Sequence, residues 1–379
     1  MLELDWLALN LVSGLGIKTL NRLLSQYSSV SELIHSPAEQ IQQKSGIPHS
    51  LALAITQAQN TRSFLIEKRL FESDSDLKLI CYESENYPKL LKEIASPPLV
   101  LYCKGSLPSP QAPCLAFVGS RTCTVYGKRH TKRLIEEIAQ IRPDTVVVSG
   151  LARGIDTVAH ETALELGLKT IAVLAGGLQH IYPPENIPLA HEITKQGALI
   201  SEFPLALKPL ARNFPIRNRI ISGLSLGTTI TESKIKSGAR ITAGFALNQN
   251  REVFALPGPV DSPTSAGPNQ LIASSAAKLV VSGSEILEEL QLCGNKSDQT
   301  SFDFAQKNKQ LLDKSNYSAE QWLALETIHH GVETIDSIHI ASKIPIDRLL
   351  GILVELELTG ILDSVGGQIY RLAENMDLP

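Results

Sequence analysis

The sequence predicts an α/β protein built on a doubly wound parallel sheet, with a small helical domain before it and a winged-helix domain after it. Over residues 112–291, short apolar segments alternate with segments that can be helical. Such alternation requires crossover connections, and therefore parallel strands with helices on both faces of the sheet. Residues 1–65 show the periodicity of short helices, and residues 318–379 indicate three helices and a hairpin.

The first domain, residues 1–65, contains two segments in which a glycine-containing turn lies beside a helical apolar pattern, LVSGLGIKTLNRLL and KSGIPHSLALAI. This arrangement is typical of a helix-hairpin-helix or SAM-like module, and such modules often contact nucleic-acid backbones. Residues 1–60, however, carry a net charge of −1. A packing or assembly domain is therefore the favoured interpretation, because a phosphate-binding module needs positive charge.

The central domain, residues 66–291, begins with short extended pieces interrupted by proline and continues with the alternating pattern. Its seven predicted strands are CLAFV, TVVVSG, KTIAVLAG, GALISEF, GTTITE, REVFALPG and KLVVSG. Residues 292–317 are mostly polar and weakly periodic, which is typical of a linker. The hairpin of the last domain, residues 318–379, is expected to turn at Gly366-Gly367.

Composition excludes several classes of protein. The N-terminal segment carries Glu3 and Asp5 where a signal peptide would carry basic residues, and no apolar run approaches the ~18 residues needed to span a bilayer. The five cysteines include no CxxC pair, which favours reduced thiols over a disulfide framework or a zinc site. We therefore expect a cytoplasmic protein with no membrane association.

Positive charge is concentrated in the middle of the chain, although the formal net charge of the whole chain is −4. Residues 203–251 carry eight basic side chains and one acidic one, and residues 115–133 carry five basic side chains and no acidic one. Three basic clusters, near residues 121–133, 208–219 and 234–240, could converge on one edge of the sheet, which would suit a polyanion better than a single nucleotide.

Glycine-rich turns follow the first three strands of the alternating pattern, at the sheet edge where open parallel sheets bind ligands. Small residues let backbone N–H groups approach an anion, and a helix N-terminus adds a partial positive charge. The alternative is that glycine serves only to turn the chain. The dinucleotide motif GxGxxG and the nucleoside-triphosphate motif GxxxxGK[ST] are both absent. The turns supply Gly119, Ser120, Arg121, Ser149, Gly150, Gly154, Gly176 and Gly177.

The segment FPIRNRIISGLS begins a predicted helix at Phe214-Pro215, since proline is tolerated in a first turn. Arg217 and Arg219 lie two residues apart, so on a helix they point roughly 200° away from each other. We expect one of them to contact an external anion and the other to brace neighbouring turns. The alternative is that both are internal braces, although no acidic residue lies nearby in the sequence.

Two patterns in the sequence resemble catalytic sites, but neither is the favoured interpretation. GLSLG matches the GxSxG motif of serine hydrolases around Ser225, but here the strand follows the serine, whereas a nucleophile elbow needs it to precede. Asp156 and His160 could share a helix face as a metal or acid–base pair. The favoured interpretation is that Asp156 caps its helix and His160 satisfies a local hydrogen bond.

Six motifs, taken in order, resemble the DNA-processing protein A family (DprA, also called Smf), over about residues 77–290. The resemblance implies an extended Rossmann fold that binds single-stranded DNA without sequence preference and works as a homodimer. It also implies loading of a RecA-type recombinase onto incoming DNA in natural transformation (competence), with no catalysis, cofactor or metal. The motifs are FVGSR, SGLARGIDTVAH, IYPPEN, ISEFPLALKPLARNFPIRNRIISGLS, KSGARITA and LPGPVDSPTSAGPNQLI.

Matched by position, the family's phosphate-binding turn, FPxRNR element and lysine–serine–glycine turn all have counterparts in this chain. Gly267-Pro268-Asn269 departs from the usual GTN, and no basic residue follows it until Lys278, whereas relatives usually carry one there. Pro183-Pro184 stands where relatives often carry a lysine, so a less basic rim and a weaker affinity are expected. The residues expected to bind single-stranded DNA are Gly119, Ser120, Arg121, Ser149, Gly150, Gly154, Asn186, Arg217, Asn218, Arg219, Lys236, Ser237 and Gly238.

Other functions stay open at this point. A phosphoribohydrolase-like enzyme on a related sheet would carry a PGGxGT turn followed by a glutamate, and LAGGLQ lacks its proline and threonine. A scaffold with a vestigial groove is a third possibility. For the C-terminal domain, residues 320–371 have a net charge of −5, so a protein contact is favoured over duplex DNA binding.

Overall fold

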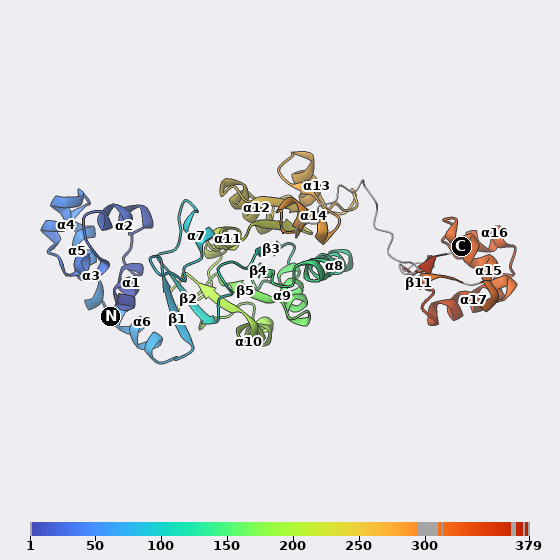
Figure 1. The fold of residues 1–379 in the computed structure, drawn as a ribbon, viewed down its shortest axis with the longest axis horizontal. Helices are drawn as coiled ribbons and strands as arrows, with labels where there is room; N and C mark the ends of the chain where they lie inside the picture. Colours follow the sequence, from blue (N-terminus) through green and yellow to red (C-terminus); the bar gives the residue numbers. More distant parts are fainter. Residues whose placement is uncertain (1, 294–309, 313, 365–368, 374–375, 378–379) are drawn as a thin grey trace. The chain divides into compact units, whose positions relative to one another are not determined.

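A computed structural model describes residues 2–293, 310–312, 314–364, 369–373 and 376–377 (Figure 1). The chain forms two compact units, residues 1–295 and residues 296–379.

The first unit is built on a mixed sheet whose strands run in the order β1-β2-β6-β5-β4-β3-β7-β8-β9 within the described residues. Strands from β6 to β9 in this order pair in parallel. All seven predicted strands are present, so the prediction of a large, mostly parallel sheet is confirmed. The strands are β1 (Leu77–Cys81), β2 (Val100–Gly105), β3 (Cys114–Val118), β4 (Val146–Ser149), β5 (Lys169–Val173), β6 (Ala198–Ser201), β7 (Gly227–Ile230), β8 (Glu252–Ala255) and β9 (Lys278–Leu279).

Helices cover both faces of the sheet, as Figure 1 shows. Side chains alternate across each strand, so in β3 Leu115 and Phe117 pack against α8 (Val125–Ile141), α9 (Ile155–Glu165) and α14 (Gly283–Glu289). Ala116 and Val118 point to the other face and join the core with α11 and α12. That second face carries α7 (Lys89–Lys92), α11 (Asn213–Leu224), α12 (Gly238–Asn248) and α13 (Ala266–Ala273).

The strands β1 and β2 extend the sheet beyond the alternating pattern found in the sequence. They pair antiparallel with each other, and β2 pairs antiparallel with β6, where Cys103 lies opposite Ile200. The sequence marked this region only as extended pieces interrupted by proline. Pairing between strands separated by a long stretch of chain leaves no local periodic signal, so the antiparallel edge could not be read from it.

The N-terminal helices pack directly on this edge of the sheet. Trp6 and Leu20 share one hydrophobic core with Val100 and Tyr102, and α10 (Ile187–Gln196) joins the same core. The predicted domain boundary at residue 65 falls within the last of these helices. They are α1 (Leu2–Asn10), α2 (Ile17–Leu24), α3 (Val30–His35), α4 (Ala38–Ser45), α5 (His49–Thr56) and α6 (Arg62–Glu72).

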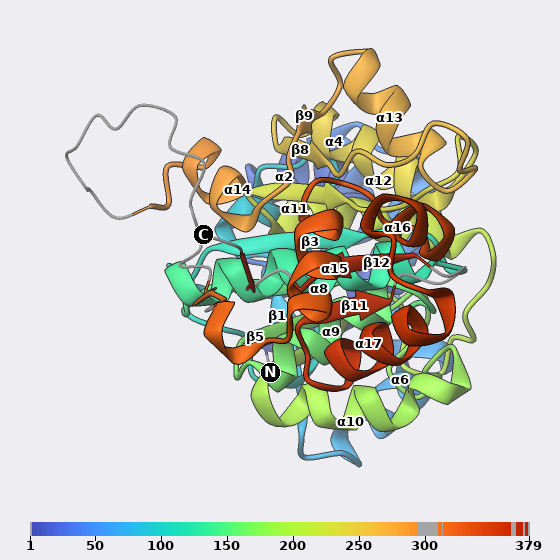
Figure 2. The same cartoon turned by 90° about the vertical axis from the view of Figure 1, so that its right-hand side faces the viewer.

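The second unit contains three helices and an antiparallel strand pair, shown facing the viewer in Figure 2. Its core gathers apolar side chains from each helix, including Trp322, Ile338 and Leu353. The expected turn at Gly366-Gly367 lies outside the described residues, and the assignment as a winged helix stays a prediction. The elements are α15 (Ala319–His329), α16 (Ile335–Ser342), α17 (Ile346–Leu358), β11 (Leu362–Ser364) and β12 (Tyr370–Leu372), with β10 (Gln310–Leu311) pairing in parallel with β13 (Met376–Asp377).

The described residues include no helix that is both long and apolar enough to cross a membrane. All five cysteines are free thiols, as expected from the absence of CxxC pairs.

Candidate nucleic-acid interface

A pocket of about 710 Å³ opens at the carboxyl ends of β3, β4 and β7. In the sheet, β3 lies between β4 and β7, so the chain reverses its direction of strand addition here. Open α/β sheets bind ligands at such a switch point. The lining residues are Val118, Gly119, Ser120, Arg121, Thr122, Ala152, Asp156, Tyr182, Pro209, Ala211, Phe214, Pro215, Arg217, Asn218, Ile221, Lys234, Lys236, Ser237, Gly238, Ala239, Ile241 and Thr242.

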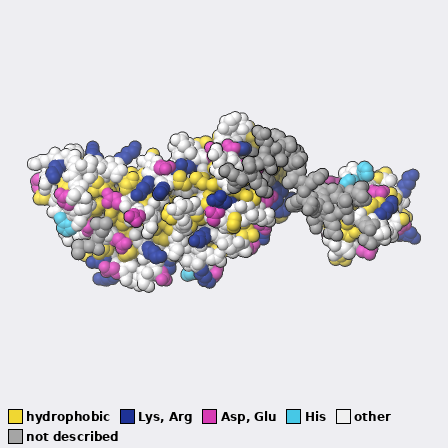
Figure 3. Space-filling view, viewed as in Figure 1, with side chains coloured by type: hydrophobic (Ala, Val, Ile, Leu, Met, Phe, Trp, Pro, Cys, Tyr) yellow, Lys and Arg dark blue, Asp and Glu magenta, His cyan; other side chains and the backbone are white. Residues whose placement is uncertain are grey.

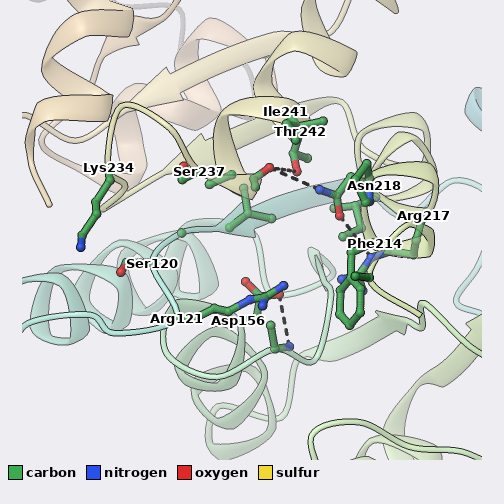
Figure 4. A pocket seen from close by; sticks show the side chains of 18 of the residues that line it. Ser120, Arg121, Asp156, Phe214, Arg217, Asn218, Lys234, Ser237, Ile241 and Thr242 are labelled. Atoms are coloured by element: carbon green, nitrogen blue, oxygen red, sulfur yellow. Dashed lines mark hydrogen bonds between the residues drawn. The ribbon is translucent and has the colours of Figure 1, made fainter. Parts of the chain in front are cut away.

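Figure 4 shows how the pocket is divided. Ser120 and Lys234 lie on one side, Phe214 and Arg217 lie on the other, and Arg121 lies beside Asp156 between them. These residues come from the loops after β3 and β7 and from the helices α9 and α11, so segments far apart in the sequence form one site.

Arg121 is the exposed cation at the centre of the pocket. Its guanidinium carbon lies 5.1 Å from the centre of the Phe214 ring, and it forms no ion pair with a described residue. Tyr182 meets the same ring edge-on, with the ring centres 5.9 Å apart, and 41% of Tyr182 is exposed. Arg121 therefore keeps its charge available while an aromatic pair supports it from the side.

Arg217 is buried at the floor of the pocket, with 3% of its surface exposed. Its Nη1 donates to the carbonyl oxygen of Gly150 at 2.7 Å and to that of Val173, and its Nε donates to Asn218 Oδ1 at 3.2 Å. Burial lowers the pKa of Arg217 to about 10, so the side chain remains charged at neutral pH. Arg217 thus places a fixed positive charge beneath the pocket.

Asp156 provides the opposite charge beside it. Its Oδ2 accepts the backbone N–H groups of Gly150 at 3.1 Å and Ala152 at 3.3 Å. It therefore orders the loop before α9, whereas the sequence interpretation made it a helix cap. Burial raises the pKa of this carboxyl group, and the charge of Arg217 together with the two N–H groups opposes that rise.

Arg219 points away from the pocket and is held by an acid that lies elsewhere in the sequence. Its Nη2 lies 2.5 Å from Glu202 Oε2, and both side chains are 15% exposed. Arg219 does not line the pocket. The geometry thus matches the alternative interpretation, in which both arginines are internal braces. The reason is that their partners are backbone carbonyls and a glutamate brought in by β6, which local sequence does not reveal.

The opposite wall is the turn before α12, which carries Lys236-Ser237-Gly238. Lys234 and Lys236 are exposed and form no ion pair with a described residue. Ser237 is the N-cap residue of α12, and its buried Oγ has no hydrogen-bond partner among the described residues. A helix N-terminus with an unpartnered hydroxyl and two nearby lysines suits an anion.

Four other predicted site residues hold the loops that form the pocket. Ser149 donates to Phe117 O at 2.6 Å, and the Asn186 amide donates to Leu151 O at 2.9 Å. Gly154 has φ +77°, and a Cβ there would overlap Ser120 O. Likewise, a Cβ on Gly150 would overlap the Arg217 guanidinium. None of these four residues lines the pocket, so they position the loops that do.

The Glu232 side chain occupies the N-terminus of α8. In such a fold, this helix end is the expected position of a bound phosphate. Glu232 is 1% exposed and accepts from Thr124 N at 2.8 Å, Thr124 Oγ1 at 2.5 Å and Thr264 Oγ1 at 3.2 Å. The protein's own carboxylate already satisfies this helix end, which leaves Arg121 and the α12 turn as the candidate anion contacts.

Sequence reasoning missed several lining residues. Tyr182 lies in the IYPPEN motif and Lys234 in a basic cluster, so each carried a signal without being assigned to the site. Thr122 gave no signal. His160, which was set aside as structural, is fully buried and its Nδ1 lies 2.7 Å from Thr170 Oγ1. Burial lowers the pKa of His160 to about 3, so it is neutral.

Charge on the rest of the first unit is mixed. On the face shown in Figure 3, basic and acidic side chains are interspersed. The local charge of the pocket, rather than a general field, is therefore the feature that would select a ligand.

A doubly wound sheet with a basic, aromatic-edged pocket at its switch point defines a Rossmann-like protein suited to an anionic ligand. Residues 78–291 match the family model of DNA recombination-mediator protein A. The chain belongs to this family of DNA-processing proteins, known as DprA or Smf.

Relatives agree along most of the chain. It is 38% identical to the protein Smf of Escherichia coli over 345 residues, which cover 90% of each chain. It is 44% identical to the DNA processing protein DprA of Bacillus subtilis over 218 residues, covering 57% of this chain and 72% of that protein.

Two solved structures show the same fold. DprA from Streptococcus pneumoniae matches with a TM-score of 0.63 and 32% identity, over 75% of this chain and 95% of that one. DNA processing protein A from Helicobacter pylori matches with a TM-score of 0.51 and 31% identity, over 57% of this chain and 95% of that one. The structural work on the H. pylori protein concerns its mode of binding single-stranded DNA.

Proposed function

We propose that this chain binds single-stranded DNA in the basic pocket, without sequence preference, and promotes assembly of a RecA-type recombinase on that DNA during natural transformation. It would act in the cytoplasm as a homodimer and without catalysis. The observation that carries the proposal is the meeting of three cations that have no ion-pair partner among the described residues, Arg121, Lys234 and Lys236, with the Tyr182–Phe214 aromatic pair.

The chemistry of a single strand matches the two kinds of group in the pocket. Cations and helix N–H groups attract phosphates regardless of sequence, and aromatic rings stack on any base because every base has a π-face. Both interactions tolerate sequence variation. The relationship to the H. pylori protein, which binds single-stranded DNA, supports the same assignment.

The enzyme alternative lacks support at each place where it would need a reactive group. Ser225 is fully buried and donates its hydroxyl to Ile221 O at 2.9 Å, so it is not available as a nucleophile. His160 is buried, neutral and bonded to Thr170. The N-terminus of α8 is occupied by Glu232 rather than open to a nucleotide phosphate.

Fluorescence anisotropy of a labelled thymidine oligonucleotide, measured over a range of salt concentrations, tests the proposal. We expect the logarithm of the affinity to fall linearly with the logarithm of the salt concentration, and Arg121→Ala to weaken binding about tenfold or more. Arg142→Ala is the matched control, because Arg142 is paired with Asp144 and does not line the pocket. A flat salt response together with turnover of a nucleoside monophosphate would instead establish the enzyme.

Recombinase loading needs its own measurement. Filament assembly by a RecA-type recombinase on single-stranded DNA coated with a single-strand-binding protein should be faster with this protein than without it. The Arg121→Ala variant should lose most of this effect, because the mediator must hold the DNA. Equal filament growth with and without the protein would rule out the mediator role while leaving DNA binding intact.

A further inference from the structure

Helix α17 in the second unit exposes a continuous stripe of apolar side chains. Ile346, Leu350, Val354 and Leu358 are 45%, 43%, 48% and 83% exposed. At 100° per residue, steps of four place these side chains along one arc of about 120°, over roughly 18 Å of helix. The buried side of α17 borders this stripe, because Leu349, Leu353 and Leu356 are buried in the core of the unit and Leu353 lies 20° from Ile346 on the helical wheel.

This stripe exceeds what the fold of the unit requires. An amphipathic helix at the surface of a globular domain normally has polar residues on the side away from the core. Here the arc from Ile346 to Leu358, next to the buried side, is also apolar, and its side chains are exposed. A contiguous exposed apolar surface of this kind marks an interaction site.

Gly351 is a second, independent feature of the same face. It lies 140° around the helix from Ile346 and next to Val354 and Leu358 on the helical wheel. A Cβ placed on Gly351 would meet nothing within 4 Å, and the residue is not at a positive φ. A glycine in a helix interior lowers helix stability relative to alanine, and nothing in the described unit requires one here. Its missing side chain leaves room for the close approach of another backbone.

Charge determines which occupant fits the stripe. Asp347 and Glu357 lie on the same arc as the apolar side chains and form no ion pair with a described residue. The arginines of the unit are already neutralised, Arg348 by Glu320 at 3.2 Å and Arg371 by Glu333 at 2.7 Å. The face therefore offers negative charge beside apolar surface.

Two occupants are disfavoured by this charge. A second copy of the unit would bring two acidic faces together, and duplex DNA would bring phosphates to the position where a winged helix commonly reads the groove. A partner with apolar and basic side chains on one helix meets both features of the stripe.

We propose that α17 is a docking surface for a basic amphipathic helix of another protein. The apolar side chains of that helix pack along Ile346, Leu350, Val354 and Leu358, and its lysines or arginines face Asp347 and Glu357. Its backbone approaches α17 most closely at Gly351. This surface lies in a different unit from the DNA-binding pocket, so its failure would leave the proposed DNA binding untouched.

The test uses the full chain and a labelled 18-residue peptide of leucine and lysine, with leucines at helical spacing, and measures fluorescence anisotropy. The same peptide with every lysine replaced by glutamate is the control ligand. We expect the lysine peptide to bind and the glutamate peptide not to bind. Leu350→Lys and Val354→Lys should each weaken binding at least tenfold, because each places a like charge and a solvated group within the stripe.

Two further variants make the result specific. Leu65→Lys adds the same charge at an exposed apolar residue, 56% exposed, on α6 in the other unit, and should leave peptide binding unchanged. Gly351→Gln should raise the melting temperature, because glutamine is the better helix former, while lowering peptide affinity severalfold. If Gly351→Gln is more stable but binds the peptide more weakly, the lost affinity comes from the docking surface and not from damage to the fold.

The proposal is overturned if the lysine peptide does not bind, or if the stripe variants bind it as tightly as the parent. It is also overturned if the parent self-associates through the stripe, seen as a mass in light scattering that drops on Leu350→Lys. Displacement of the peptide by duplex DNA would assign the face to nucleic acid instead.

Discussion

The pocket of the first unit and the surface of the C-terminal unit contain the same kinds of charged residue in opposite arrangements. In the pocket, Arg121, Lys234 and Lys236 form no ion pair within the described residues. In the C-terminal unit, Arg348 and Arg371 are each paired with a glutamate. Both regions carry cations, but Arg348 and Arg371 would each have to release a carboxylate before they could bind a phosphate, whereas the three pocket cations would not.

The second difference is burial. The pocket rests on a buried charge, Arg217, whose guanidinium is fixed by carbonyl oxygens and faced by Asp156. The ion pairs of the C-terminal unit are exposed and screened by water. From this comparison we expect the charged residues at the pocket to matter for both fold stability and ligand binding, and those of the C-terminal unit to contribute little to either.

The largest expected effect comes from removing the buried charge beneath the pocket. Arg217→Ala leaves Asp156 buried without its partner charge and two carbonyl oxygens without their donor. We expect a loss of about 3–5 kcal/mol in the free energy of unfolding, measured by urea titration. Arg348→Ala in the C-terminal unit is the matched control. An Arg217→Ala protein as stable as the parent would mean that the floor charge does not hold the pocket together.

The next effect is on DNA affinity. The triple variant Arg121→Ala/Lys234→Ala/Lys236→Ala should bind a thymidine oligonucleotide at least a hundredfold more weakly, since three charge-assisted contacts are worth roughly 1 kcal/mol or more each. The salt dependence should flatten at the same time, because fewer counterions are released. Removing Lys343, Arg348 and Arg371 together should leave affinity nearly unchanged. If the two triple variants lost the same DNA affinity, the contrast between the pocket and the C-terminal unit would be wrong.

A smaller effect follows from His160, a buried residue of α9. The pKa of His160 in the folded state is about 3, below its ordinary value of 6.5, so between these values the unfolded chain binds more protons than the folded one. Stability should therefore fall as the pH drops below 6.5, by about 2 kcal/mol at pH 5. Urea titrations at pH 7 and pH 5 should show a smaller drop for His160→Gln and the parent drop for the exposed His330→Gln. The same drop in all three proteins would assign the pH dependence to other groups.

The smallest effect is expected at an exposed ion pair of the C-terminal unit. Arg371→Ala removes its pair with Glu333, where 56% of the arginine side chain is exposed. We expect no measurable change in the free energy of unfolding, because such pairs are solvated and screened. Thermal unfolding in low and high salt measures it. A loss comparable to that of Arg217→Ala would show that these surface pairs hold the unit together.

The sequence was informative where the signal is local. Each parallel strand is a short apolar run, and each run of the alternating pattern became a strand. The turn Gly119-Ser120-Arg121 and the α12 turn were likewise visible, because glycine and basic residues cluster in them. From the sequence alone, these features predict a pocket at one edge of the sheet.

The parts that were missed depend on contacts across the sheet. The antiparallel edge of β1 and β2 depends on pairing with β6, which follows more than 90 residues after the end of β2. The roles of Arg217 and Arg219 depend on the carbonyl oxygens of Gly150 and Val173 and on Glu202. A search for acidic neighbours in the local sequence could find none of these partners.

The carboxylate of Glu232 at the N-terminus of α8 affects how the protein would interact with the free nucleotides of a cell. A mononucleotide gains most of its affinity for a Rossmann-like sheet from a single phosphate site at such a helix end. Here that site is filled by the protein itself, so a monomer would have to displace a carboxylate held by three hydrogen bonds. A DNA strand bound as proposed would instead spread its contacts over several weaker positions, which would let the protein distinguish the polymer from a free nucleotide.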